Sequence, residues 1–246
     1  PMILERLFYS KVKPPILMFD FDGVICNSLD VVLPEVKMVF DEVGFDKLST
    51  REELISLLDG NVFLRLTAAG FPIGKLKWLG HKFKPHMEKL YSRIEPFPGI
   101  VAVVNQAAEA FPLYIITGNR VETVASFCSR NGIRGVREII GSDVERSKVK
   151  SIRRIKKLHP DREPYYIGDT LGDMHEARKA GVKRIGADWG WHGRERLQRE
   201  NPEYIAENPE DLTALFLKFQ REAEEWKMVP TRLGKIFEFL KSVRGS

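Results

Sequence analysis

The apolar residues of this chain gather in six short segments, at about residues 16–20, 112–117, 136–140, 164–168, 183–187 and 203–206. Each segment is either continuously apolar or alternates apolar with polar residues, which is typical of β-strands. Patterns with an apolar residue every three to four positions lie between most of them and predict helices. Strands that alternate with helices in this way predict an α/β protein with a doubly wound, mostly parallel sheet.

The stretch over residues 28–95 interrupts this alternation. It shows no strand pattern, and we expect helices at about residues 29–43, 50–58, 61–69 and 74–93, the last interrupted by Pro85. The run Pro96-Phe97-Pro98-Gly99 then closes the stretch with residues typical of turns. We therefore predict a small all-helical domain at 28–95, inserted into an α/β core made of residues 1–27 and 96–212.

The remaining residues, 213–246, are predicted to form a C-terminal helical extension of two amphipathic helices that Pro230 separates. Its second half carries an apolar stripe made of Leu233, Ile236, Phe237 and Leu240. Such a stripe most often packs on its own core, with contact between two copies as the alternative. A monomer and a homodimer both remain open.

Composition narrows the class of protein. The chain has 246 residues, of which 43% are hydrophobic and 30% are charged, as expected of a globular protein. No run approaches the roughly 20 apolar residues that span a bilayer, and the first residues lack a signal-peptide pattern. We therefore expect a cytoplasmic protein without a membrane partner.

The net charge of +5 suits an anionic substrate, but the basic residues are scattered, so no nucleic-acid partner is expected. The two cysteines, Cys26 and Cys128, are too few for a disulfide framework, and their separation argues against a zinc cluster.

Candidate chemistry begins where the first strand segment runs into Asp20-Phe21-Asp22-Gly23. In an open parallel sheet, ligands bind beyond the carboxyl ends of the strands. Alternation along an extended chain places Asp20 and Asp22 on the same side, where two neighbouring carboxylates are costly unless a cation neutralises them. A hard divalent cation such as Mg²⁺ is the favoured explanation, and a simple acidic turn is the alternative.

Two further segments carry groups suited to binding an anion. The strand at 112–117 ends in Thr117-Gly118-Asn119, where the hydroxyl and the following backbone N–H groups are able to bind a phosphate. Later in the chain, Lys148 opens a helical pattern and is expected to place a positive charge near that phosphate. Arg146 and Lys150 are close competitors for this role.

The strand at 164–168 ends in a second acidic group. Asp169 and Asp173 are four residues apart, which places them near one another across the first turn of a helix. Together with the earlier acids, they extend the expected metal site.

Four motifs now stand in order along the chain: Asp20-x-Asp22-Gly23, Thr117-Gly118-Asn119, Lys148, and Gly168-Asp169-x-x-x-Asp173. In this the chain resembles the haloacid dehalogenase (HAD) superfamily, and within it the phosphatases similar to phosphoglycolate phosphatase. The resemblance covers residues from about 15 to about 212. It implies a HAD-like Rossmannoid core, a helical cap domain over residues 28–95, and Mg²⁺ as cofactor.

The resemblance also implies a role for each motif residue. Asp20 would attack phosphorus to form an aspartyl-phosphate, and Asp22 would protonate the leaving alcohol and then activate water. The metal would be held by Asp20, the backbone carbonyl of Asp22 and Asp169, with Asp173 adjusting these ligands or holding Lys148. Phosphate would be bound by Thr117, Gly118 and Asn119, while Lys148 offsets the carboxylates.

The expected function is therefore a magnesium-dependent phosphatase for a small phosphorylated metabolite, such as phosphoglycolate or a sugar phosphate. The alternatives are a phosphomutase of the same superfamily and a non-catalytic binding or regulatory protein with the same fold. The cap is expected to select the substrate through one or more basic residues, with the candidates Arg65, Lys75, Lys77 and Lys82. Core loops around Trp189 and Trp191 are the competing location.

Overall fold

Six parallel strands form the central sheet of the computed structural model, which describes residues 13–48, 50–58, 62–75 and 89–224. Their order across the sheet is β3-β2-β1-β4-β5-β6. The strands are β1 (Pro15–Phe19), β2 (Leu113–Ile116), β3 (Val136–Ile140), β4 (Glu163–Gly168), β5 (Lys183–Ala187) and β6 (Tyr204–Ala206). The six strand segments predicted from the apolar pattern are thus confirmed to within one residue at each end.

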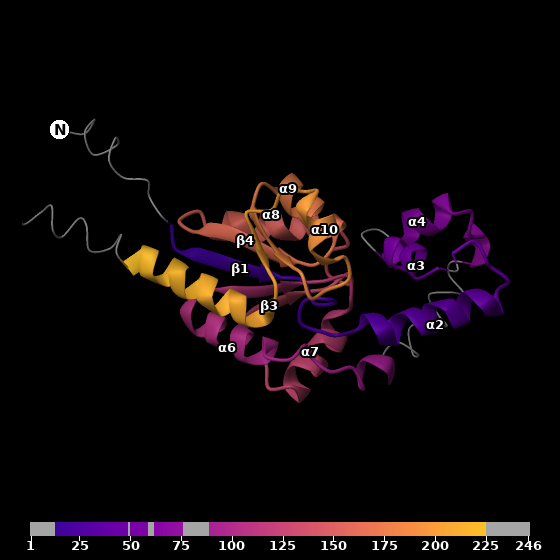
Figure 1. The fold of residues 1–246 in the computed structure, drawn as a ribbon, viewed down its shortest axis with the longest axis horizontal. Coiled ribbons are helices and arrows are strands. Elements are labelled where there is room, and N and C mark those ends of the chain that lie inside the picture. Colours follow the sequence, from indigo (N-terminus) through magenta and orange to yellow (C-terminus); the bar gives the residue numbers. More distant parts are fainter. Residues whose placement is uncertain (1–12, 49, 59–61, 76–88, 225–246) are drawn as a thin grey trace, which may run out of the picture.

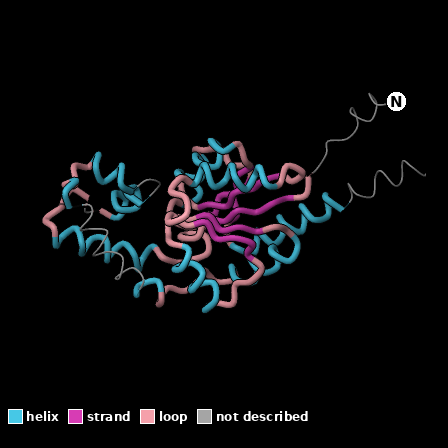
Figure 2. The backbone as a smooth tube through the Cα atoms, turned by 180° about the vertical axis from the view of Figure 1, so that it is seen from behind, coloured by secondary structure: helices cyan, strands magenta, loops and turns pink. Residues whose placement is uncertain are grey.

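Helices cover both faces of this sheet, which confirms the doubly wound α/β fold (Figures 1 and 2). The helices of the α/β part are α6 (Ile100–Ala110), α7 (Val121–Arg130), α8 (Lys148–Leu158), α9 (Leu171–Ala180) and α10 (Gly193–Gln198). Side chains of α6 and α7 belong to one buried cluster, and those of α8 and α9 belong to a second cluster. The sheet therefore separates two hydrophobic cores.

Strand β1 shows why its sequence is apolar without interruption. Leu17 and Phe19 lie in the cluster with α6 and α7, whereas Ile16 and Met18 lie in the cluster with α8 and α9. Successive side chains of a strand point to opposite faces, so a strand that is covered on both faces needs apolar residues at every position.

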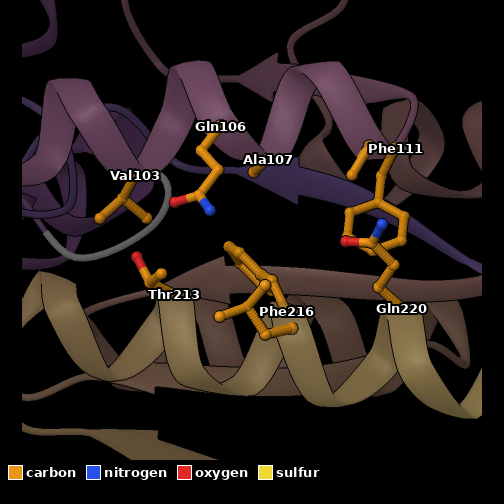
Figure 3. Close-up of a pocket in the computed structure, with 9 residues that line it drawn as sticks. Val103, Gln106, Ala107, Phe111, Thr213, Phe216 and Gln220 are labelled. Atoms are coloured by element: carbon orange, nitrogen blue, oxygen red, sulfur yellow. The ribbon is translucent and has the colours of Figure 1, made fainter.

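A further helix, formed by residues 209–224, packs on the same face of the sheet as α6. The Phe216 ring lies 6.3 Å from that of Phe19, and Phe219 stacks on Tyr165 at 4.5 Å. Figure 3 shows Phe216 facing α6 across a cavity of only about 20 Å³. The expected start of an extension at residue 213 falls inside this helix, and the apolar stripe predicted beyond Pro230 lies outside the described residues.

The inserted segment is helical wherever the structure describes it. It contains α2 (Leu29–Glu42), α3 (Arg51–Leu58), α4 (Val62–Ala68) and the short 3₁₀ helix η1 (Ile73–Lys75), and residues 89–91 are also helical. These helices lie to one side of the sheet in Figure 1. Most of the helix expected at 74–93 falls on residues 76–88, outside the described part of the chain, as do Lys77, Lys82 and Pro85.

The two connections between this insertion and the α/β part run side by side. The Asn27 N–H donates to the Glu95 carbonyl, and the Phe97 N–H donates to the Ile25 carbonyl, each at 3.0 Å. Both connections therefore form one hydrogen-bonded hinge beside the end of β1. The division into core, cap and extension remains a prediction.

Candidate active site

The strand order reverses between β1 and β4, which are neighbours in the sheet although they are far apart in the sequence. Asp20 directly follows β1, and Asp169 directly follows β4. Such a reversal opens a crevice at the carboxyl ends of the strands, where α/β proteins bind ligands. The fold thus delivers two acids from distant parts of the chain to one place.

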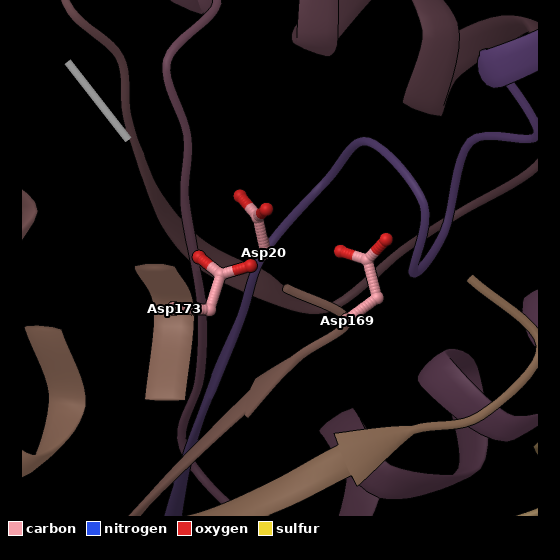
Figure 4. Close-up of side chains that lie close together, drawn as sticks. All are labelled: Asp20, Asp169 and Asp173. Carbon is pink, nitrogen blue, oxygen red and sulfur yellow. The ribbon is translucent and has the colours of Figure 1, made fainter. Parts of the chain in front are cut away.

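Three carboxylates meet there (Figure 4). Each of Asp20, Asp169 and Asp173 offers one oxygen atom within 4.8 Å of the others. All three residues are buried, with exposed fractions of 6%, 0% and 2%. Three buried acids at this separation need compensating positive charge.

Part of that charge comes from Lys148, the first residue of α8. Its Nζ atom lies 2.7 Å from Asp173 Oδ1 and 3.0 Å from Asp20 Oδ1. Burial acts to lower the pKa of Lys148, but Asp173 and Asp20 raise this pKa well above its ordinary value, so the ammonium stays charged. The competing residues Arg146 and Lys150 are exposed.

Asp173 is held by hydrogen bonds on both oxygens. In the first turn of α9 it forms a capping box with Thr170, whose hydroxyl donates to Oδ2 at 2.8 Å. Tyr166 donates to Oδ1 at 3.3 Å, alongside Lys148. Burial acts to raise the pKa of Asp173, but Lys148 and Thr170 hold this pKa below its ordinary value. This arrangement fits an ionised residue that fixes Lys148.

Asp169 is engaged on one oxygen only. Its Oδ2 accepts from the Trp191 N–H at 2.7 Å, whereas its Oδ1 is buried with no hydrogen-bond partner among the described residues. Burial, together with the negative charge of Asp173, raises the pKa values of Asp169 and Asp20 well above their ordinary values. An unsatisfied buried oxygen beside two further carboxylates fits the oxygen-ligand set that a hard divalent cation requires.

The space around Asp169 depends on two glycines. Gly23 has φ +76°, and a Cβ atom there would collide with the Asp169 carboxylate and the Trp191 ring. A Cβ atom at Gly190 would meet Asp169 from another side. The sequence singled out the loop of Trp189 and Trp191 for substrate selection, and its role in holding Asp169 becomes visible only in the folded chain.

Asp22 has different partners from those of the three clustered acids. Tyr91 donates to its Oδ1 at 2.7 Å, and the Asn119 side-chain amide donates to its Oδ2. Burial raises the pKa of Asp22, and the Tyr91 hydrogen bond opposes this rise. The extended strand ends at Phe19, and Asp22 lies in the segment that follows it.

The turn after β2 brings its hydroxyl and amide toward the same site. The Thr117 hydroxyl oxygen accepts from the Asn119 N–H at 3.0 Å, and Thr117 is buried. Helix α7 begins only at Val121, so Thr117 shapes the turn and does not cap the helix. Gly118 is exposed, and its backbone faces open space.

A cavity of about 460 Å³ lies between the insertion and the α/β part. Leu171 and Gly172, which follow directly after the Asp169-Thr170 turn, line it together with residues of both parts: Glu52, Ser56, Arg65, His175, His192, Arg196, Arg199 and Glu200. Of the expected cap residues, Arg65 lines this cavity, where its Nη1 atom also donates to the Ser56 carbonyl at 2.6 Å. Lys75 is not among the lining residues, and its ammonium donates to the Val43 carbonyl.

Comparison with known proteins agrees with this geometry. Residues 17–187 match the family described as haloacid dehalogenase-like hydrolase, and the chain belongs to that family. It is 22% identical over 213 residues to phosphoglycolate phosphatase of Synechococcus elongatus, covering 84% of this chain and 99% of the relative. It is 23% identical over 210 residues to pyrophosphatase PpaX of Bacillus pumilus, covering 81% and 94%.

Solved structures show the same fold. A haloacid dehalogenase-like family protein from Streptococcus pneumoniae superimposes with a TM-score of 0.69 at 23% identity, covering 82% of this chain and 98% of that one. A hydrolase from Pseudomonas syringae gives 0.71 at 19%, covering 83% and 98%. The expected family and fold are confirmed, and the enzyme class agrees with the phosphatase activity expected from the sequence. No helix in the described residues is long and apolar enough to span a membrane.

Proposed function

We propose that this protein is a magnesium-dependent phosphatase that hydrolyses a small phosphorylated metabolite through an aspartyl-phosphate. The observation that carries the proposal is the buried group of Asp20, Asp169 and Asp173 at the reversal of the strand order, with Lys148 bound to two of them. A phosphate monoester repels a carboxylate nucleophile, so its hydrolysis depends on positioning and charge neutralisation. This site supplies both.

Asp20 is the proposed nucleophile. One of its oxygens would form a bond to phosphorus while the bond from phosphorus to the leaving oxygen breaks. Lys148, 3.0 Å from Asp20 Oδ1, would hold the attacking carboxylate in place and offset the charge of the incoming phosphate. Thr117, Gly118 and Asn119 would bind the phosphoryl oxygens.

Asp22 is the proposed general acid and base. It would give its proton to the leaving alcohol and afterwards accept a proton from the water that attacks the aspartyl-phosphate, releasing inorganic phosphate and restoring Asp20. Burial raises the pKa of Asp22, which favours a carboxyl group able to carry that proton.

Mg²⁺ would be held by Asp20 and Asp169, and by the Asp22 backbone carbonyl. Asp173, whose two oxygens are already hydrogen-bonded, would act through Lys148. Bound there, the cation would neutralise the carboxylates and polarise the phosphate.

Relatives are named phosphoglycolate phosphatase and pyrophosphatase, and phosphoglycolate and pyrophosphate are small molecules with a second anionic group beside the phosphoryl group, which suggests the substrate class. We propose that the substrate carries a second anionic or polar group that reaches Arg65 in the cavity between the insertion and the α/β part.

The test is release of inorganic phosphate from 4-nitrophenyl phosphate and from a panel of phosphorylated metabolites, with Mg²⁺ and after exhaustive chelation. We expect hydrolysis that needs the cation and that favours one member of the panel. No phosphate release from any substrate would support the non-catalytic alternative, and isomerised phosphate ester without net release would support a phosphomutase.

A further inference from the structure

Tyr91 belongs to the insertion and contacts Asp22, the proposed catalytic acid. It lies 69 residues after Asp22 in the sequence, yet its hydroxyl donates to Asp22 Oδ1 at 2.7 Å. Its side chain is only 5% exposed. None of the sequence motifs included this tyrosine.

The second oxygen of Asp22 is held from the other side of the site. The Asn119 side-chain amide donates to Asp22 Oδ2 and also to the Tyr91 hydroxyl, the latter at 3.0 Å. Asp22, Tyr91 and Asn119 therefore form a closed ring of hydrogen bonds in which each carboxylate oxygen has one donor. In this partly buried setting such a ring restricts rotation of the carboxylate more than a single contact would.

Tyr91 itself is fixed to the α/β part. Its ring stacks on Phe21 with 6.2 Å between centroids, and Phe21 packs edge-on against Phe127 at 5.0 Å. An Arg130 Nη2 atom donates to the Tyr91 carbonyl at 3.1 Å and to the Ile94 carbonyl at 2.8 Å. The residue that holds Asp22 is thus anchored to the α/β part beside the hinge.

We propose that Tyr91 is a positioning residue for Asp22: its hydroxyl, together with Asn119, keeps the carboxyl group directed away from the Asp20, Asp169 and Asp173 cluster and toward the leaving group. This inference rests on the proposed function, because it takes Asp22 as the proton donor. Without the hydroxyl, the Asp22 side chain gains rotamers that place its proton out of reach of the leaving oxygen.

Loss of the Tyr91 hydroxyl should slow hydrolysis of alkyl phosphates and leave hydrolysis of 4-nitrophenyl phosphate nearly unchanged. Departure of an alcohol needs a proton, whereas departure of 4-nitrophenolate needs little help. Tyr91→Phe keeps the ring and its stacking on Phe21 and removes only the hydroxyl. We expect it to slow the first turnover of an alkyl phosphate by about 10- to 100-fold, within the usual contribution of acid–base catalysis. First-turnover release of 4-nitrophenol should change by less than about 3-fold, with KM nearly unchanged.

The experiment measures first-turnover release of the alcohol and of 4-nitrophenol. The alkyl substrate is phosphoglycolate, or the alkyl phosphate that the wild-type protein hydrolyses fastest. Tyr114→Phe is the matched control, because Tyr114 is also buried and its hydroxyl is 2.8 Å from His159 Nε2, away from the acids. The control should leave both rates unchanged.

A double mutant separates the two proposals. If Tyr91 acts through Asp22, Tyr91→Phe should cost nothing further in an Asp22→Asn background. Equal slowing of both substrates by Tyr91→Phe, no slowing of either, or a full additional loss in the double mutant would overturn the positioning role. Wild-type alkyl turnover by Asp22→Asn alone would instead overturn the proposed function.

Should Tyr91→Phe fail to fold, Arg130→Gln decides the question. It removes the donor to the Tyr91 and Ile94 carbonyls and leaves the hydroxyl in place. Selective slowing of the alkyl substrate supports the inference, and an unchanged ratio of the two rates contradicts it.

Discussion

The ammonium group of Lys148 lies 2.7 Å from Asp173 Oδ1, so an acid in the first turn of α9 fixes the lysine that opens α8. The same ammonium reaches Asp20, and it therefore links the proposed nucleophile to a carboxylate that is already saturated with hydrogen bonds.

Removing this lysine should damage both activity and stability. In Lys148→Ala, Asp20 and Asp173 lose their ion-pair partner, and we expect kcat/KM to fall at least about 100-fold. The free energy of unfolding should drop by about 2 kcal/mol, below the usual range for a broken buried pair because Lys148 is partly exposed. Lys150→Ala, on the exposed face of the same helix, is the control. Comparable losses of activity and stability in Lys148→Ala and Lys150→Ala would show that the losses come from the change to helix α8 and not from the broken ion pairs.

Stability of the metal-free protein should depend on pH in a defined direction. Asp20 and Asp169 have raised pKa values in the fold, so the folded state binds protons more tightly than the unfolded state does. Their stabilising contribution to the free energy of unfolding is greatest below the ordinary pKa of 3.8. This contribution is lost as pH rises through the raised pKa values of the folded state. Asp173, whose pKa is lowered, contributes in the opposite sense.

We therefore expect Mg²⁺ to raise the thermal unfolding midpoint, and to raise it more at pH 8 than at pH 6. Proton competition for the ligands is weaker at the higher pH. Asp169→Asn should largely abolish the Mg²⁺ effect. A shift that is equal at both pH values, or that survives in this variant, would place the cation elsewhere.

Gly190→Ala tests how tightly Asp169 is held. Its new methyl group would meet the Asp169 side chain, whereas Ala at Gly74 has open space. We expect Gly190→Ala to destabilise the protein by about 1–3 kcal/mol, as overpacking does, and to weaken Mg²⁺ binding measured by titration calorimetry. Gly74→Ala should leave both quantities unchanged. Normal Mg²⁺ affinity in Gly190→Ala would mean that Asp169 is not a ligand.

Substrate selection should separate Arg65 from Lys75. Arg65, which donates to the Ser56 carbonyl, lines the cavity together with Leu171 and Gly172, whereas Lys75 does not line it. Arg65→Ala should raise KM for the preferred metabolite by about 10-fold, the equivalent of one charged hydrogen bond, and barely change KM for 4-nitrophenyl phosphate. Lys75→Ala should change neither. If Arg65→Ala leaves the ratio unchanged, specificity resides in other residues, with the loop of Trp189 and Trp191 as the next candidate.

The sequence predicted the strands well because both faces of the sheet are covered. Strands such as β1 and β4 are then apolar at nearly every position and stand out from the helices between them. The order of the strands is set by crossovers and not by any local pattern. The adjacency of β1 and β4, which brings Asp20 beside Asp169, therefore had to come from the structure.

Asp20 and Asp169 were predictable because each follows a strand directly, while the contacts that support them were not. Tyr91 and the Trp191 N–H reach the site from segments with no motif of their own. The side-chain partners of Asp22 come from Tyr91 and Asn119, which strand alternation does not identify. Spacing in the sequence locates a residue on its element, but it does not reveal partners that are brought close by a hinge or a distant turn.

The most direct measurement of the central claim is to locate the phosphoryl group during turnover. Asp22→Asn protein is mixed with Mg²⁺ and 4-nitrophenyl phosphate, quenched in acid, and analysed by peptide mass spectrometry. Attack by Asp20 remains feasible on this substrate, but hydrolysis of the intermediate lacks its base. The account predicts one phosphoryl group on Asp20, and none when Asp20→Asn is added. Phosphate on another residue, or label that persists in the double variant, would contradict it.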